Sequence, residues 1–288
     1  MALRGKAPEE VEKRLKMFIY GASGVGKTTT AISFPNCYLI DTEHGSENSQ
    51  YGDLIKKNNG VTFHSSDFKE ILQEVRALRT ETHSYKTLII DPMTTVYNNL
   101  VDSHSVKNGK DNTEYGRHTA AAKKDMKRFF DLLLSLDMNL ILTAHAKKEY
   151  AQGSMTVIGK TFDFFEGAEY VFDLVLEIQK IGKKRIGKVV KTRIKTFEEG
   201  EEFDWSYEAV VAKYDRDVME ALTKPIVVAS SEEVAQLMHL ISVLKVSSED
   251  VGKWCKKAKV SHLEDMPQDI ILKCIASLQN SINTKEVK

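Results

Sequence analysis

Short apolar runs alternate with segments of helical periodicity along the first half of the chain. The apolar runs predict strands at 15–20, 37–41, 61–63, 87–91 and 139–143. Helices are expected to begin at 28 and to cover 68–78 and about 117–136. Strands that alternate with helices in this way predict an α/β fold with a mostly parallel sheet and helices on both faces. Ligands of such sheets bind at the carboxyl ends of the strands.

The pattern changes in the second half of the chain. Apolar runs at 172–178, 189–196 and 207–211 are predicted as further strands, antiparallel and at the edge of the sheet. Residues 229–283 predict three short helices instead, because Ser230 and Ser247 are good N-caps followed by acidic residues and Pro267 can open a third helix. This small helical module either packs on the core as a cap or docks a partner or DNA. On its first helix, the residues Val234, Leu237, Met238, Ile241 and Leu244 are expected to share the buried face.

The composition narrows the class of protein. The chain of 288 residues has 41 Lys+Arg and 41 Asp+Glu, so any nucleic-acid binding must depend on local basic patches. Cys37, Cys255 and Cys274 lack metal-ligand spacing, which argues against a zinc site and a disulfide framework. No apolar run reaches the ~18 residues that a membrane span needs, and no signal-type segment opens the chain. We therefore expect a cytoplasmic protein that has no membrane partner.

One turn carries the most specific chemical signature. The segment 21–28 reads GASGVGKT, which fits the phosphate-binding pattern G-x-x-x-x-G-K-[ST] between a predicted strand and a predicted helix. In such a loop the backbone N–H groups surround phosphates, Lys27 neutralises their charge, and the Thr28 hydroxyl holds Mg²⁺. We expect ATP and Mg²⁺ as ligands. The predicted nucleotide-binding residues are Gly21, Ala22, Ser23, Gly24, Val25, Gly26, Lys27, Thr28 and Thr29.

Other chemically important side chains follow the predicted strands. Asp91 ends an apolar strand, where its carboxylate would reach Mg²⁺ through water. The segment Asp41-Thr42-Glu43-His44-Gly45 follows the strand 37–41. Thr143-Ala144-His145 ends the strand that begins at 139, and Lys191-Thr192-Arg193 lies late in the predicted sheet. Strand alternation is expected to place Lys191, Arg193 and Lys195 on one face.

These motifs together resemble the RecA-like ATPases over residues 14–215, and most closely a group of short phage ATP-dependent single-strand annealing proteins. The resemblance implies that Glu43 is the general base, that His145 senses the γ-phosphate, and that Lys191 and Arg193 reach the nucleotide of a neighbouring subunit. AAA+ ATPases usually place their glutamate directly after the strand-end Asp, whereas Pro92 stands there in this chain. The simpler alternatives are a solvated acid for Glu43, a structural histidine, and a basic edge strand.

The resemblance also implies contacts with single-stranded DNA through two polar segments that are predicted as loops. One spans 106–118, and the other follows the strand that ends near His145 and includes Gly153 and Phe162. Basic and aromatic side chains there could pair with phosphates and stack on bases, although such loops are often only mobile surface. The predicted DNA-binding residues are Arg117, Lys147, Lys148, Tyr150 and Lys160.

The predicted protein is therefore a DNA-stimulated, Mg²⁺-dependent ATPase that forms a ring or filament and promotes annealing or strand exchange in phage homologous recombination. A single-strand binding protein is a possible partner. The expected organisation is a short arm at 1–14, a RecA-like ATPase domain at 15–225 and the helical module at 229–283. Two alternatives stay open: a replicative helicase or helicase-loader type motor, and a nucleotide-switched binding protein without turnover.

Overall fold

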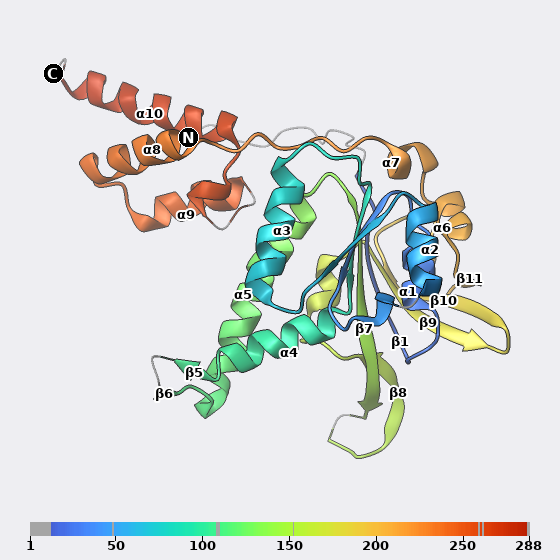
Figure 1. The fold of residues 1–288 in the computed structure, drawn as a ribbon. Helices are drawn as coiled ribbons and strands as arrows, with labels where there is room; N and C mark the ends of the chain where they lie inside the picture. The colour runs from blue at the N-terminus through green and yellow to red at the C-terminus, as the bar shows by residue number, and fades with distance from the viewer. Residues whose placement is uncertain are drawn as a thin grey trace.

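A large mixed sheet forms the centre of the protein (Figure 1). The computed structural model describes residues 13–286 except 48, 108, 109, 152, 259 and 261, so most of the predicted arm at 1–14 lies outside the described residues. In spatial order the strands are β11 (Glu202–Asp204), β10 (Lys184–Thr192), β9 (Leu174–Ile181), β1 (Lys16–Gly21), β7 (Asn139–Tyr150), β4 (Thr87–Asp91), β2 (Cys37–Asp41) and β3 (Val61–His64). A ninth strand, β8 (Val157–Phe162), pairs with the far end of β7.

Most neighbouring strands are parallel. β1 runs parallel to β7 and β9, and β4 runs parallel to β7 and β2. The register aligns Gly21 with His145 and Asp41 with Asp91, so the ends of these four strands meet at one edge of the sheet. Only β10, β11 and β8 are antiparallel to their partners in this described sheet. The predicted α/β fold with a mostly parallel sheet is therefore confirmed.

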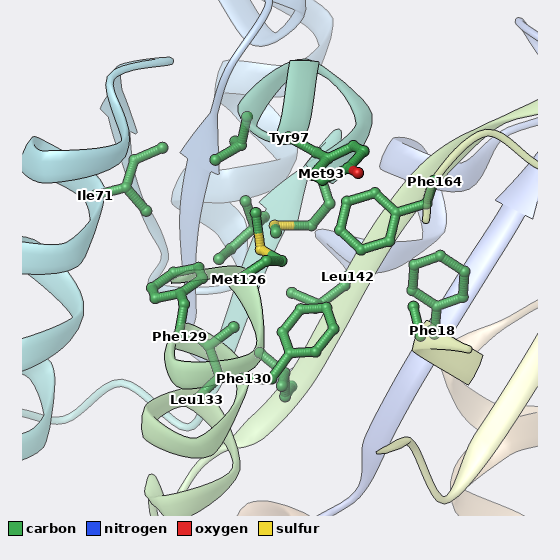
Figure 2. Close-up of a cluster of buried hydrophobic side chains, with 14 of the residues drawn as sticks. Phe18, Ile71, Met93, Tyr97, Met126, Phe129, Phe130, Leu133, Leu142 and Phe164 are labelled. Carbon is green, nitrogen blue, oxygen red and sulfur yellow. The ribbon is translucent and has the colours of Figure 1, made fainter. Parts of the chain in front are cut away.

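Helices cover both faces of the sheet, because successive apolar side chains of β1 point to opposite faces and both sets are buried. Phe18 and Tyr20 enter one apolar cluster, whereas Met17 and Ile19 enter the other. The first cluster packs under α3 (Phe68–Thr80), α4 (Met93–Ser103) and α5 (Arg117–Ser135) and is rich in aromatic rings (Figure 2). The second packs under α1 (Lys27–Ala31), α2 (Ser49–Lys57), α6 (Tyr207–Lys213) and α7 (Arg216–Glu220).

Three predictions about the later strands were wrong. The run 207–211 forms helix α6, because Ser206 caps it by accepting a hydrogen bond from Ala209 N at 3.2 Å and Val210 and Val211 share its buried face. β9 runs parallel to β1 rather than antiparallel at an edge. β10 ends at Thr192, so the predicted run to 196 is too long, and the short edge strand β11 was not predicted.

Two segments that were predicted as loops contain strands. β7 continues past the sheet to Tyr150 and forms a projecting hairpin with β8 (Figure 1). β5 (Val106–Lys107) and β6 (Lys110–Asp111) form a second, two-stranded hairpin before α5. Sequence alone missed the first hairpin because its charged residues hide the alternation that a half-buried strand shows.

The C-terminal helical module contains α8 (Ser231–Val243), α9 (Ser248–Lys257) and α10 (Gln268–Glu286), which share an apolar cluster of their own. Ser230 forms a complete capping box, and Ser247 caps α9, as predicted. Met238 was expected to be buried but is 56 % exposed, whereas Leu240 is buried. Arg76 of α3 donates to Asp265 Oδ2 at 2.9 Å and thereby joins the module to the core.

None of the helices in the described part of the chain is both long and apolar enough to cross a membrane.

Candidate functional site

The phosphate-binding segment 21–28 connects β1 to α1 at the carboxyl edge of the sheet. Gly24 and Gly26 have φ angles of 74° and 94°, which favour glycine. Lys27 is only 8 % exposed, and its Nζ donates to the carbonyls of Gly21 at 2.9 Å and Ala22 at 3.0 Å. Burial lowers the pKa of Lys27, while the negative charges of Asp91 and Glu43 oppose that effect. The loop thus has the backbone and the cation of a phosphate site.

Asp91 lies directly beside this loop. The hydroxyls of Thr28 and Thr143 donate hydrogen bonds to its two carboxylate oxygens, one to each. Burial raises the pKa of Asp91, while the two hydroxyls and Lys27 act to lower it. Thr143 lies on β7, which separates β4 from β1, and sequence reasoning had not assigned it a role.

The oxygens of Thr28 and Asp91 suit Mg²⁺, which prefers hard oxygen ligands and takes the rest from water and phosphate. Across the described residues, no group of three or more His, Cys, Asp and Glu side chains could hold a metal ion. The donor set therefore fits an ion that binds together with a nucleotide better than a metal that the protein holds alone.

Glu43 and His145 meet across the same edge. His145 Nε2 lies 3.5 Å from Glu43 Oε2, and the hydroxyl of Thr95 donates a hydrogen bond to Glu43 Oε1. Thr95 lies near the start of α4, directly after the strand that ends at Asp91, and sequence reasoning missed it. The predicted base and the predicted sensor are therefore neighbours, although their strands are more than 90 residues apart in the chain.

Asp41 fixes the loop that carries Glu43. Its carboxylate accepts hydrogen bonds from the Ser46 hydroxyl at 2.5 Å, from Ser46 N at 2.7 Å and from Glu43 N at 3.3 Å. Burial alone would raise the pKa of Asp41, but these hydrogen bonds hold it below the ordinary value. An ionised, fully bonded Asp41 keeps the backbone of Glu43 in place.

A cavity of about 210 Å³ joins these groups. Lys27, Thr28, Asp91, Glu43 and His145 all line it, and so does Thr29 from the first turn of α1. The structure thus places in one cavity all the residues that were predicted to take part in hydrolysis of the nucleotide of their own subunit. The walls combine the Lys27 cation with the carboxylates of Asp41, Glu43 and Asp91 and with several hydroxyl groups, which is a polar lining suited to a charged ligand.

Lys191 and Arg193 lie elsewhere. β10 runs antiparallel to β9, so Thr192 pairs with Leu174 at the amino edge of the sheet, opposite the phosphate loop. Lys191 Nζ donates to the Phe172 carbonyl, and Arg193 Nη2 donates to the Tyr170 carbonyl. The predicted common strand face of Lys191, Arg193 and Lys195 was wrong, because the register shifts after Val189 and the strand ends at Thr192.

Arg185, which sequence reasoning missed, lies against the phosphate loop instead. It is the second residue of β10 and lies at the opposite end of that strand from Lys191. A Cβ atom built on Gly26 would clash with Arg185 Nε, so the two residues touch. The only sequence signal is the basic run Lys183-Lys184-Arg185, and such runs are common on protein surfaces.

The predicted DNA-binding residues fall on two separate hairpin regions (Figure 1). Lys147, Lys148 and Tyr150 lie on β7, and Lys160 lies on β8. Arg117 begins α5 beside β5–β6, and its guanidinium carbon lies 5.8 Å from the ring centre of Tyr115, which is 93 % exposed. Phe162 cannot stack on a base, because its ring packs edge-on against Phe18 at 5.3 Å.

Thr94 joins the base of the β7–β8 hairpin to the candidate site. Its hydroxyl accepts a hydrogen bond from His145 N at 3.0 Å and donates one to the Asp163 carbonyl at 2.9 Å. Asp163 N in turn donates to the His145 carbonyl at 2.7 Å. The backbone of His145 is therefore fixed to both the hairpin and α4.

The fold and the loop define the class of protein. A phosphate loop after β1, with β7 between β1 and the Asp91 strand β4, is the core of a P-loop NTPase. The family model described as "AAA domain" matches residues 13–204, more than half of the chain, and the chain belongs to that family. The glutamate that AAA+ enzymes usually carry after the strand-end Asp is replaced here by Pro92.

One solved structure that the chain is similar to is titled "Crystal structure of the RadB recombinase". The sequence identity is 16 %, the match covers 65 % of this chain and 84 % of that chain, and the TM-score is 0.41. No curated protein matches the chain.

Proposed function

We propose that this chain is a Mg²⁺-dependent, DNA-stimulated ATPase that binds single-stranded DNA and promotes annealing or strand exchange in homologous recombination, as phage-type annealing proteins do. The observation that carries this proposal is the convergence of Lys27, Thr28, Asp91, Glu43 and His145 on one cavity. Each of these side chains has the chemistry that one part of ATP hydrolysis needs.

Within this site, the loop N–H groups and Lys27 bind the β- and γ-phosphates of ATP. Thr28 and Asp91 hold the Mg²⁺, which when bound offsets the negative charge of the phosphates. Glu43 orients the attacking water and accepts its proton. Thr95 and His145 contact the two carboxylate oxygens of Glu43 and hold it toward the cavity, where His145 also senses the γ-phosphate.

The proposed oligomer uses the opposite edge of the sheet. Lys191 and Arg193 are too far around the sheet to reach the phosphate loop of their own subunit, since they lie at its amino edge. A head-to-tail ring or filament would bring this edge toward the carboxyl edge of the next subunit. There the two cations would stabilise the negative charge that develops on the neighbour's γ-phosphate.

The proposed DNA contact is one face of the β7–β8 hairpin. Lys148 lies directly opposite Lys160, and like charges in that position destabilise a strand pair. A DNA phosphate between the two lysines would remove this repulsion. Tyr150 follows on the same face and is 49 % exposed, which leaves its ring free to stack on a base. Lys147 faces the other way and forms an ion pair with Asp163 at 3.5 Å.

Thr94 provides a physical link between the two proposed activities. The hairpin that would hold DNA and the residue that would sense ATP share its hydroxyl group. A displacement of His145 by the γ-phosphate therefore pulls on the base of the hairpin. We also propose that residues 15–225 act as the ATPase domain and that the module at 229–283 caps it or docks a partner, such as a single-strand binding protein.

The test is annealing of two complementary oligonucleotides, one with a fluorophore and one with a quencher, with and without ATP and Mg²⁺. The proposal expects faster quenching by the wild type than by Lys148→Ala or Glu43→Gln, with Lys147→Ala as the matched control. Unwinding of a forked duplex would instead identify a helicase-type motor. ATP binding without turnover, in the presence of DNA, would identify a nucleotide-switched binding protein.

A further inference from the structure

The β9–β10 hairpin continues past the phosphate loop on the side away from Asp91. β9 runs parallel to β1 and pairs Glu177 with Tyr20, so its last four residues extend beyond its pairing with β1. The chain turns at Gly182, which has a φ of 61°, and returns along β10 through Arg185. The hairpin therefore forms a wall beside the loop that holds the phosphates.

The backbone of Arg185 is bonded beside the loop, and its side chain packs against the loop. Its carbonyl accepts a hydrogen bond from Trp205 N at 2.8 Å, and Trp205 Nε1 donates to the Gly26 carbonyl at 3.3 Å. Trp205 is 3 % exposed, so this connection is rigid. The Nε and Cδ atoms of Arg185 occupy the space that a Cβ atom of residue 26 would need, which only a glycine leaves free.

The guanidinium of Arg185 has no use within the subunit. In the part of the chain that the structure describes, no hydrogen bond or ion pair engages its side chain, and the residue is exposed. The other cations around the sheet ends differ, because Lys27, Lys191 and Arg193 each donate to backbone carbonyls. An unpaired guanidinium beside a ligand loop can bind a ligand.

The geometry of the site decides which end of a nucleotide Arg185 meets. Asp91 ends β4, Glu43 follows β2 and His145 lies on β7. These three strands all lie on one side of β1, and the three residues mark the position of the γ-phosphate. Arg185 lies on the other side of β1, beyond β9, and does not line the cavity that these residues share. When the triphosphate of a bound nucleotide points toward Asp91, its nucleoside extends from the loop on the side of Arg185.

We propose that Arg185 contacts the nucleoside end of the nucleotide bound in its own subunit, with its guanidinium plane stacked on the purine base. This inference rests on the proposed function, because it requires that the loop binds a purine nucleotide. The planar guanidinium suits such stacking, whereas the ammonium of a lysine does not.

The test is equilibrium binding of ATP, ADP and inorganic tripolyphosphate, with Mg²⁺, to the full chain by calorimetry. Arg185→Ala and Arg185→Lys should both raise the Kd for ATP and ADP about tenfold and leave the Kd for tripolyphosphate unchanged. Lys184→Ala is the matched control, because Lys184 is an exposed neighbour on the opposite face of β10, and its three Kd values should equal those of the wild type. Melting temperatures check that every variant is folded.

Two results would overturn the inference about Arg185 and leave the proposed function intact. One is an ATP affinity that stays within about twofold of the wild type in Arg185→Ala while Lys27→Ala loses both ligands. The other is an equal loss of tripolyphosphate and ATP binding in Arg185→Ala, which would make Arg185 a phosphate contact. A wild type that binds neither ATP nor tripolyphosphate would overturn the proposed function, and this inference with it.

Discussion

Thr143 donates its hydroxyl hydrogen to one oxygen of the Asp91 carboxylate, from the strand that separates Asp91 from the phosphate-loop strand. Thr28 of the phosphate loop donates to the other oxygen. Asp91 is thus oriented from both sides before any ion binds. Burial raises the pKa of Asp91, and both hydroxyls and Lys27 act against that rise because they favour the charged carboxylate.

Removing the Thr143 hydroxyl should therefore weaken the metal site. In Thr143→Val we expect a several-fold higher Mg²⁺ concentration at half-maximal ATP binding, because the carboxylate loses a donor that favours its charged form. Thr143→Ser keeps the hydroxyl and should behave as the wild type. The measurement is a Mg²⁺ titration of ATP binding, and equal midpoints in all three proteins would show that Thr143 does not position Asp91.

The burial of Lys16 leads to a prediction of how the stability of the fold depends on pH. It is 7 % exposed, and its Nζ donates to the carbonyls of Leu136 at 2.8 Å and Met138 at 2.7 Å. Burial lowers the pKa of Lys16 to about 7 from its ordinary value of 10.5, against the attraction of Asp137 and Asp173. Between these two pH values the unfolded chain binds the proton that the folded chain has lost, so the free energy of unfolding should rise with pH.

We expect the contribution of Lys16 to approach a slope of about 1.4 kcal/mol per pH unit between about pH 7 and 10. Denaturant titrations at several pH values in this range give the free energy of unfolding of the wild type and of Lys16→Met. The difference between their slopes against pH is the contribution of Lys16. Lys13→Met, at an exposed position near the same strand, is the control and should keep the slope of the wild type. Parallel pH profiles for the wild type and Lys16→Met would show that Lys16 stays charged in the folded protein.

The salt dependence of DNA binding separates the two faces of the β7–β8 hairpin. Lys148→Ala and Lys160→Ala should each weaken binding to single-stranded DNA and reduce the log–log salt slope by about 0.7 for each phosphate that the variant no longer binds. Lys147→Ala should have little effect, because Lys147 pairs with Asp163 on the other face. Fluorescence anisotropy at several salt concentrations measures these slopes. An equal effect of all three substitutions would indicate general electrostatic attraction instead of a defined face.

The proposed contact between subunits can be tested by mixing inactive variants. Arg193→Ala should lose about 10³-fold or more in turnover and keep its ATP affinity, because the charge it meets develops in the transition state. A mixture of Arg193→Ala with Lys27→Ala should recover part of the activity, since one mixed interface has both an intact loop and an intact arginine. Failure to recover, with co-assembly shown by light scattering, would leave Lys191 and Arg193 with contacts inside their own subunit, to the carbonyls of Phe172 and Tyr170 and to the Asp173 carboxylate.

Much of the central sheet was predictable from the sequence. The strands Cys37–Asp41 and Thr87–Asp91 have the predicted bounds, because each is a short apolar run that ends in an acid. The cluster of polar residues at one edge followed from the rule that parallel strands end together. α6 was missed because Val210 and Val211 favour strands, whereas the cap at Ser206 and the packing of the helix decide the outcome.

The contacts that refine the site were not predictable, because they join residues far apart in the chain. Arg185 meets Gly26 only through the register of β10 on β9 and of β9 on β1. Likewise, the pairing of Lys148 with Lys160 depends on where the β7–β8 hairpin turns. Periodicity predicts that a strand exists, but it does not predict which residue of another strand lies opposite.

The most direct test of the central claim is ATP hydrolysis by Glu43→Gln. The amide can still orient water but cannot accept its proton, so the account predicts ATP affinity close to that of the wild type and a phosphate-release rate at least about 10²-fold lower. Thr95→Val, which removes only the hydrogen bond to Glu43, should show a smaller loss. Phosphate release and ATP binding should be measured on the same preparations. Hydrolysis by Glu43→Gln at the rate of the wild type would contradict the account.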